Sequence, residues 1–323
     1  MSRVPRRSLL KSALAGVAWS GAASAQGEKT AGQATAVTHL VSRRMDEMTS
    51  REIELYLKAG GDLVLIPFGP VSGHGALIPV GMHAHWAHAL SVLIAEKANG
   101  LVFPLTHCCF AGATRTFRGT VSFTFEEQVT VLKRIASTLQ KQGFRRTVLV
   151  GGTNPEDTGG MVAARELFDE TEKPFWFVSA TRALQLPEVK ALYEGYPGKF
   201  GETQLALASL KILGRERPIP LERWAREIKA EGHDQPDEIA ADVTEMRRLG
   251  GVGFRYHEES NHGNRGNAGI VFKGRSDVEL AVEVLHKSAE AVIPGLSRLQ
   301  HYADWLDQHP ASFIRAKERL DEK

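Results

Sequence analysis

The sequence predicts an α/β fold of three layers, in which helices cover both faces of a mainly parallel sheet. Short apolar runs alternate with stretches of helical periodicity along most of the chain. Helices that separate consecutive strands favour parallel pairing, because a parallel crossover needs about a dozen residues or more. The chain has 323 residues, 42% hydrophobic and 24% charged, which is ordinary composition for a packed globular domain. We expect a single such domain over residues 45–323.

The first half of that domain contains two expected strands and two expected helices. Residues 62–68 form an apolar run that ends at Gly69-Pro70, and a second run covers 101–105. Helical spacing extends from Trp86 to Ala98. Thr124 and Glu127 have the spacing of a capping box, so a helix begins there and continues to about Gln142, where a glycine follows.

The second half repeats the alternation. Expected strands cover 147–150 and 175–178, and expected helices cover 160–169 and 203–213. A second capping box, at 276–279, opens a helix that we expect to reach about residue 292.

The N-terminus has the pattern of an export signal. Arg6 and Arg7 precede a short, moderately apolar run over 12–22, and Ala23-Ser24-Ala25 is a small-residue cleavage site. The arginine pair resembles a twin-arginine signal, and the run is too short to span a bilayer stably. We therefore expect residues 1–25 to be removed, residues 26–44 to form a linker or N-terminal arm, and the mature protein to be periplasmic.

Charge and cysteine content exclude several classes of protein. The formal charge is +2, and removing residues 1–25, which hold four basic residues and no acid, leaves 36 basic and 38 acidic residues. No block of like charges supports binding to nucleic acid or to a membrane surface. Two cysteines cannot form a disulfide scaffold.

Histidines concentrate where a ligand site is expected. Ligands of parallel sheets bind beyond the carboxyl ends of the strands. Four of the 12 histidines lie within the 15 residues 74–88, which follow the first expected strand. They are His74, His83, His85 and His88. Imidazole is both a common metal ligand and a general base near neutral pH. On a helix, His83 and His85 diverge, whereas His85 and His88 share a face.

The same loop resembles the first metal loop of the creatininase (creatinine amidohydrolase) family, which reads Gly-Ser-x-Glu-Gln-His-Gly-Pro-His-Leu-Pro-Leu. Gly69, His74, Gly75 and Pro79 stand at matching positions. Further matches follow in the family's order, and the resemblance extends from about Met45 to about Leu213. They are Phe117-Arg118-Gly119-Thr120 for Phe-Pro-Gly-Thr, the segment 143–150 before the family's Asn-Gly-His-Gly-Gly-Asn loop, and Glu202-Thr203 for the Glu-Thr of His-Ala-Gly-x-x-Glu-Thr-Ser.

The resemblance implies a three-layer fold, hydrolysis of a small and often cyclic amide, and a closed homo-oligomer, a hexamer. It also implies a two-metal site built from Glu, His, Asp, His and Glu. Mapped onto this chain, those positions are Ser72, His74, His83, Thr153 and Glu202. Two metal ions close together need bridging carboxylates, and His83 replaces the bridging Asp. A two-metal centre is therefore not expected.

A single divalent ion held by His74, His83 and Glu202 is the expectation that replaces it, with zinc, manganese or iron as candidates. Two histidines and one carboxylate with an open position are the ligands of a hydrolytic zinc site. We expect Ser72, Thr153, Asn154 and His262 to contact the substrate. His262 belongs to the polar stretch 254–267, which could close over the site, reach a neighbouring subunit or be a solvated surface loop.

Two other readings of the same residues stay open. Without metal, His74 or His83 could act as a base while Glu202 orients or protonates, giving a lyase or isomerase; Ser72 or Thr153 could then hold substrate or act as nucleophile. Alternatively, the loss of ligands could mean a protein that binds a small molecule or a protein partner without catalysis. The leading hypothesis is an exported hydrolase of a small cyclic amide or lactone.

Overall fold

A computed structural model describes residues 40, 42–74, 78–152, 154–196, 200–216, 245, 246, 248 and 275–310. Its centre is a parallel sheet of four strands in the order β2-β1-β3-β4. The strands are β1 (Leu63–Phe68), β2 (Leu101–Val102), β3 (Arg146–Gly151) and β4 (Phe175–Ser179). Leu65 is in register with Val102 on one side and with Val148 on the other. All four carboxyl ends therefore point to the same edge of the sheet.

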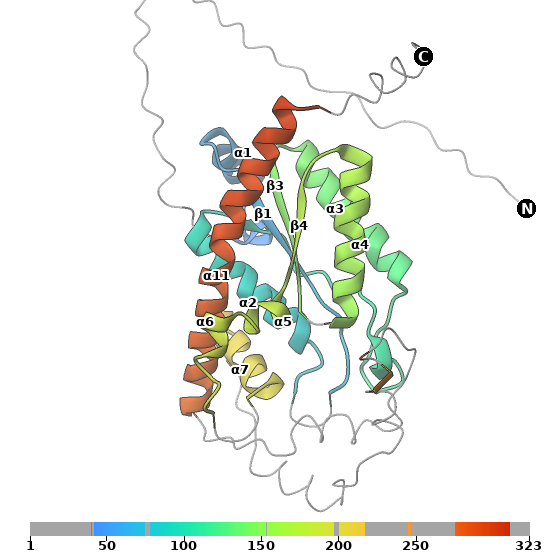
Figure 1. Ribbon diagram of the computed structural model, residues 1–323, viewed down its shortest axis with the longest axis vertical. Coiled ribbons are helices and arrows are strands. Elements are labelled where there is room, and N and C mark those ends of the chain that lie inside the picture. Colours follow the sequence, from blue (N-terminus) through green and yellow to red (C-terminus); the bar gives the residue numbers. More distant parts are fainter. Residues whose placement is uncertain are drawn as a thin grey trace, which may run out of the picture. The chain divides into compact units, whose positions relative to one another are not determined.

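Helices cover both faces of this sheet (Figure 1). Leu63, Leu65 and Val148 point into one core with α2 (Met82–Ala98), α7 (Glu202–Ile212) and α11 (Arg275–Gln308). Val64, Ile66 and Phe68 point into the other core with α1 (Ser50–Lys58), α3 (Phe125–Lys141) and α4 (Asn154–Thr171). Two short helices, α5 (Ala180–Leu184) and α6 (Pro187–Lys190), and two 3₁₀ turns, η1 (Met45–Glu47) and η2 (Gly112–Thr114), complete the described elements. The predicted three-layer α/β fold is confirmed.

Local sequence signals predicted the bounds of several elements accurately. The Thr124 hydroxyl accepts from the Glu127 N–H at 3.1 Å, and the Glu127 carboxylate accepts from the Thr124 N–H at 2.8 Å, so the predicted capping box opens α3. Strands β1, β3 and β4 lie within one residue of their expected ends, whereas β2 is shorter than expected. The sequence-based start of α2, at Trp86, was four residues late, so His83 and His85 both lie inside the helix.

The predicted start of helix α4, at residue 160, was wrong. The helix begins at Asn154 and includes Gly159 and Gly160. A Cβ at Gly160 would lie 2.7 Å from the rings of Phe177 and Phe68, and a Cβ at Gly159 would lie 2.5 Å from Gln128 of α3. These glycines therefore allow α4 to pack closely on the sheet and on α3.

Helix α11 was predicted to end near residue 292, but it continues through Pro294 to Gln308. It also contains Ser276, so the capping position expected there is wrong. Next to the proline, a Cβ at Gly295 would lie only 2.1 Å from the Trp176 ring of β4. Leu296, Leu299 and Ala303 beyond it are buried. Burial of this apolar stripe offsets the hydrogen bond that proline removes from a helix.

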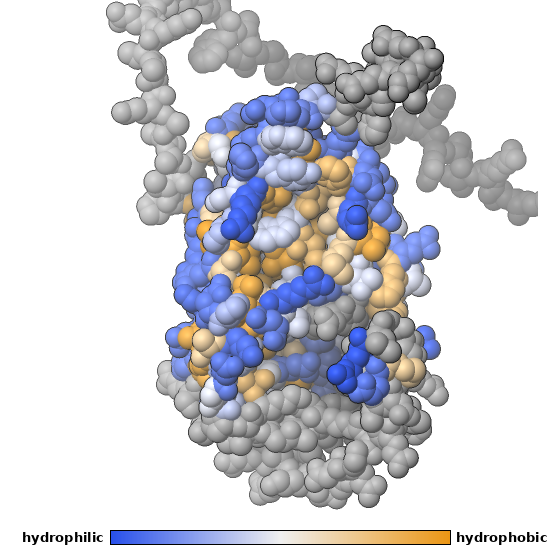
Figure 2. All heavy atoms as spheres, in the orientation of Figure 1, coloured by the Kyte–Doolittle hydropathy of each residue, from blue (hydrophilic) through white to orange (hydrophobic). Residues whose placement is uncertain are grey.

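An apolar groove of about 690 Å³ runs along the outer side of β4, between α4 and α11. Figure 2 shows the apolar band on this face, flanked by hydrophilic side chains. Its walls include Phe168, Trp176, Leu299 and Tyr302. None of the expected site residues lines this groove, so the site has to be sought at the carboxyl edge of the sheet.

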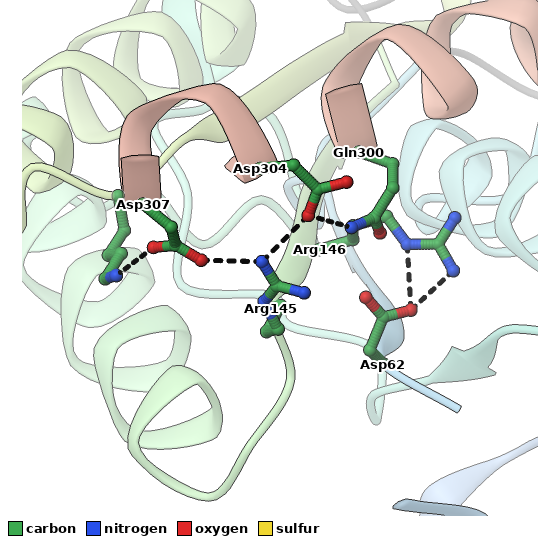
Figure 3. Close-up of polar contacts among 7 residues, drawn as sticks. Asp62, Arg145, Arg146, Gln300, Asp304 and Asp307 are labelled. Carbon is green, nitrogen blue, oxygen red and sulfur yellow. Dashed lines mark hydrogen bonds and ion pairs between the residues drawn. The ribbon is translucent and has the colours of Figure 1, made fainter. Parts of the chain in front are cut away.

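The amino end of the sheet carries a cluster of ion pairs (Figure 3). Arg146, at the start of β3, donates from Nε to Asp62 at 2.8 Å. Arg145 donates to Asp304 at 3.0 Å and to Asp307 at 2.6 Å, both on α11. These contacts attach the last turns of α11 to the beginning of β3.

Other expectations fall outside the described residues. The predicted signal at 1–25 and most of the arm at 26–44 lie there, as does the polar stretch 254–267. Within the described part of the chain, no helix combines the length and apolar character needed to cross a bilayer.

Candidate active site

Three of the expected ligands converge at the carboxyl edge of the sheet. His74 follows β1, His83 lies in the first turn of α2, and Glu202 is the first residue of α7. His74 Nδ1 is 3.9 Å from Glu202 Oε2, and His83 Nε2 is 3.9 Å from Glu202 Oε1. One donor atom from each residue lies within 4.8 Å of the other two. Segments separated by more than 100 residues thus meet at one point.

The two imidazoles are buried, whereas the carboxylate is accessible to solvent. His74 and His83 are 4% and 7% exposed, and the Glu202 side chain is 44% exposed. The rings meet edge to face, with centroids 4.5 Å apart. A carboxylate at the first position of a helix is also favoured by the helix dipole. The site therefore has two buried imidazole rings on one side and a carboxylate that is accessible to small molecules on the other.

Glycines bring the start of α2 onto the strand ends. A Cβ at Gly69, just after β1, would lie 2.7 Å from the backbone of Ala84. A Cβ at Gly152, just after β3, would lie 2.3 Å from the carbonyl oxygen of His83. Real Cβ atoms do not approach backbone this closely, so glycine is needed at both positions. These close main-chain contacts position His83 in the site.

Ser72 contacts the site through His74. Its Oγ lies 2.9 Å from His74 Nε2, the ring nitrogen opposite the one that faces Glu202. The Ser72 N–H donates to Val80 at 2.8 Å, and the next residue, Gly73, donates to the Thr120 hydroxyl at 2.8 Å. Ser72 itself is only 2% exposed. Its hydroxyl is therefore directed at the histidine ring.

The remaining two histidines of the cluster lie outside the site. Burial lowers the pKa of His88 to about 4, helped by the positive charges of Arg44 and Arg215. Burial also lowers the pKa of His85, again with Arg215 nearby. Both rings are therefore neutral in the folded protein near pH 7. The expected divergence of His83 and His85 on one helix is what places them in different surroundings.

Asp157 is a candidate functional residue that the sequence analysis missed. It is 2% exposed, and one carboxylate oxygen accepts from the Ser179 hydroxyl at 2.5 Å. Burial raises its pKa to about 6, although Ser179, Arg182 and His83 act in the opposite direction. A buried acid of raised pKa, here in the first turn of the helix that follows β3, is typical of functional sites. Its position soon after β3 was the available signal, which the late start predicted for α4 obscured.

The structure places four of the seven expected site residues and brings all four together. They are Ser72, His74, His83 and Glu202. Thr153 and His262 lie outside the described residues. Asn154 begins α4, but its side chain is not among the described ones.

The donor set fits one divalent ion. Two imidazole nitrogens and one carboxylate oxygen are the protein ligands of an open, hydrolytic zinc site. Among the described residues, His74, His83 and Glu202 are the group of three or more potential ligands whose donor atoms converge. That group contains a single carboxylate, which is too few for the bridging and charge neutralisation of two adjacent ions.

The family model for creatininase, described as creatinine amidohydrolase, matches residues 46–211, which is more than half of the chain. This chain belongs to the creatininase family. The match extends from η1 into α7 and includes all four described site residues. Members of the family are amidohydrolases, so hydrolase is the coarse class of this protein.

Solved creatininases have the same fold. A zinc–zinc creatininase variant is 20% identical with a TM-score of 0.57, covering 79% of this chain and 98% of its own. A manganese creatininase is 20% identical with a TM-score of 0.56, covering 79% and 99%. A putative creatinine amidohydrolase from Bacteroides fragilis is 14% identical with a TM-score of 0.57, covering 79% and 95%. A comparison with curated protein sequences finds no match.

Proposed function

We propose that this protein is an exported hydrolase that opens a small cyclic amide or lactone, with one divalent ion held by His74, His83 and Glu202. The convergence of these three donors within 4.8 Å at the carboxyl edge of the sheet carries the proposal. The family supports the reaction class and the small-molecule substrate. The identity of the ion, zinc, manganese or iron, is part of the proposal.

The chemistry divides between the ion and the side chains. When bound, a divalent ion lowers the pKa of a water molecule towards 7 and polarises a carbonyl oxygen. Glu202 supplies negative charge and leaves the site open on its exposed side. The buried rings of His74 and His83 exclude bulk water from the other side, which strengthens electrostatic interactions with the substrate.

Export and assembly complete the proposal. The twin-arginine-like segment at residues 1–25 supports a periplasmic location, and this route carries proteins that are already folded. Family resemblance supports a homo-hexamer. Thr153, Asn154 and His262 are the proposed substrate contacts beside Ser72.

A metal-free reaction is the second candidate, and one observation favours it. His74 lies between Ser72 at Nε2 and Glu202 at Nδ1, which is the order of a nucleophile, a base and an orienting acid. Such a relay could serve acid–base chemistry, including a lyase or isomerase reaction, without an ion.

Elemental analysis of the mature protein separates these possibilities. The protein should be exported, purified without chelator and analysed per chain, beside a His74→Ala variant. About one zinc, manganese or iron per chain, lost in the variant together with hydrolysis of cyclic amides or lactones, is the expected result. As a matched control, Glu290→Gln removes an exposed carboxylate of α11 that pairs with Lys97, and should keep the metal.

Two results would contradict the proposal. Metal-free protein that still turns over with a bell-shaped pH profile would support acid–base chemistry instead. Metal-free protein without turnover, but with a ligand that raises its melting temperature, would indicate a binding protein.

A further inference from the structure

His74 shares its two ring nitrogens between different partners. Nε2 lies 2.9 Å from the Ser72 hydroxyl, and Nδ1 faces Glu202 at 3.9 Å. A neutral imidazole carries one proton, so the nitrogen that binds a cation is the one without it. The partner of the other nitrogen therefore decides which face of the ring is available to a metal.

The ring nitrogen of His74 that faces Glu202 is the candidate donor to a cation. His74 Nδ1 lies 3.9 Å from Glu202 Oε2, and His74, His83 and Glu202 form one group of converging potential ligands. If Nδ1 binds a cation, Nε2 carries the proton and donates it to Ser72 Oγ. A serine hydroxyl can accept this hydrogen bond, since it has two lone pairs.

Ser72 is held firmly enough to play this part. Its own N–H donates a hydrogen bond to the Val80 carbonyl, and the carbonyl of the preceding residue, Val71, accepts from the Val121 N–H at 2.9 Å. Gly73, on the other side, is bonded to Thr120. Because Ser72 is only 2% exposed, water has little access to replace its hydroxyl in a Ser72→Ala variant. A fixed hydrogen-bond partner of this kind orients a metal-binding ring before the metal arrives.

We propose that Ser72 is a positioning residue, whose hydroxyl accepts the Nε2–H of His74 and so presents His74 Nδ1, together with His83 Nε2 and Glu202, to a divalent cation. This rests on the proposed metal site but adds a role to a residue that touches no metal. The two histidines then bind through different nitrogens, Nδ1 for His74 and Nε2 for His83.

The first test measures metal affinity directly. Apo protein is titrated with zinc in competition with a chromogenic chelator, for the wild type, Ser72→Ala and Ser91→Ala. Ser91 is a matched control, since it is buried in α2 and its hydroxyl donates to the Ala87 carbonyl of the same helix at 2.8 Å. We expect Ser72→Ala to weaken zinc binding by roughly 10- to 100-fold, the usual effect of losing a partner of a metal ligand. Ser91→Ala should change it little.

The second test does not depend on a variant folding. Wild-type protein labelled with ¹⁵N-histidine is loaded with ¹¹³Cd, and the couplings between metal and nitrogen are recorded by NMR. We expect one histidine to couple through Nδ1 and the other through Nε2. The zinc titration of the first test gives a further readout. Ser72→Ala should hold less metal than the wild type at limiting zinc and regain it at excess zinc, whereas loss of a nucleophilic serine would leave the metal content unchanged.

Several outcomes would overturn the proposal, and they separate it from the proposed function. Coupling through Nε2 of both histidines, or unchanged zinc affinity in Ser72→Ala, would refute the role of Ser72 while the metal site stands. Normal zinc binding with complete loss of turnover, and labelling of wild-type Ser72 by a fluorophosphonate, would make it a nucleophile instead. Wild-type protein that binds neither zinc nor cadmium would refute both proposals.

Discussion

The two ends of the sheet use charged and titratable side chains in opposite ways. At the amino end, Arg145 and Arg146 contact Asp62, Asp304 and Asp307 at hydrogen-bond distance (Figure 3). At the carboxyl end, the contacts between Glu202 and the two histidines are 3.9 Å. The ion pairs of Arg145 attach α11 to the start of β3. The wider spacing between Glu202 and the two histidines leaves room for an atom that three donors share.

Burial differs in the same direction. Arg145 and its aspartate partners are close to half exposed, and exposed ion pairs of this kind contribute little to stability. His74, His83 and Asp157 are buried, where polar groups are costly unless they have partners. Buried polar groups that lower stability in this way are expected at functional sites. Four predictions test this contrast, beginning with the largest effect.

Replacing His83 should remove the metal site. We expect His83→Ala to weaken zinc binding by more than about 100-fold. Loss of a hydrogen-bond partner of a metal ligand costs up to about 100-fold, and here a ligand itself is lost. His85→Gln, two residues along the same helix, should bind zinc like the wild type. Zinc titration of the apo proteins measures both. Equal losses in the two variants would show that the effect is general damage to α2.

Asp157 should make the stability of the metal-free protein depend on pH. Its pKa is raised from 3.8 to about 6 in the folded state, so the folded protein binds the proton more tightly than the unfolded one. The contribution of Asp157 to stability is therefore full below pH 3.8 and is lost as the pH rises through 6, a loss of about 3 kcal/mol. Asp157→Asn lacks this loss.

Urea unfolding of the wild type and Asp157→Asn at pH 3.5 and pH 7 measures the effect. The variant should gain about 3 kcal/mol on the wild type between the two pH values. His88, whose pKa is lowered, contributes a slope of opposite sign, but it is present in both proteins and cancels. A stability difference that is the same at both pH values would contradict the raised pKa.

Gly152→Ala should damage both the fold and the site. The added Cβ would lie 2.3 Å from the His83 carbonyl, so α2 has to shift away from β3. We expect a loss of about 2 kcal/mol in unfolding free energy, together with weaker zinc binding. Gly195→Ala is the matched control, because a Cβ there meets nothing within 4 Å. Wild-type stability in Gly152→Ala would show that this contact is looser than described.

Asp62→Asn should affect only the amino end. The variant weakens a partly buried pair in which one carboxylate oxygen accepts two guanidinium hydrogen bonds of Arg146. We expect a loss of about 1 kcal/mol in unfolding free energy, measured in urea, and unchanged zinc affinity. A change in zinc affinity as large as that of Ser72→Ala would mean that the two ends are coupled.

Local patterns predicted those elements whose signals lie within a few residues. The start of α3 follows from Thr124 and Glu127, whose side chains bond to each other's backbone. Strands β1 and β3 follow from apolar runs bounded by glycine. The prediction was wrong for the start of α4, which also includes residues 154–159, and for the end of α11, which continues through Pro294. There, packing against Phe177 and Trp176 decided the outcome, and these contacts link residues distant in the sequence.

By itself, the sequence determined the parallel three-layer fold, the family resemblance and the identity of three candidate ligands. Those properties depend on residue types, their order and their local spacing. Only the tertiary structure decided that His74, His83 and Glu202 converge, that Ser72 faces His74, and that Asp157 is buried. The physical reason is that three separate chain segments end at one edge of the sheet, and Gly69 and Gly152 let α2 approach it closely enough to complete the site.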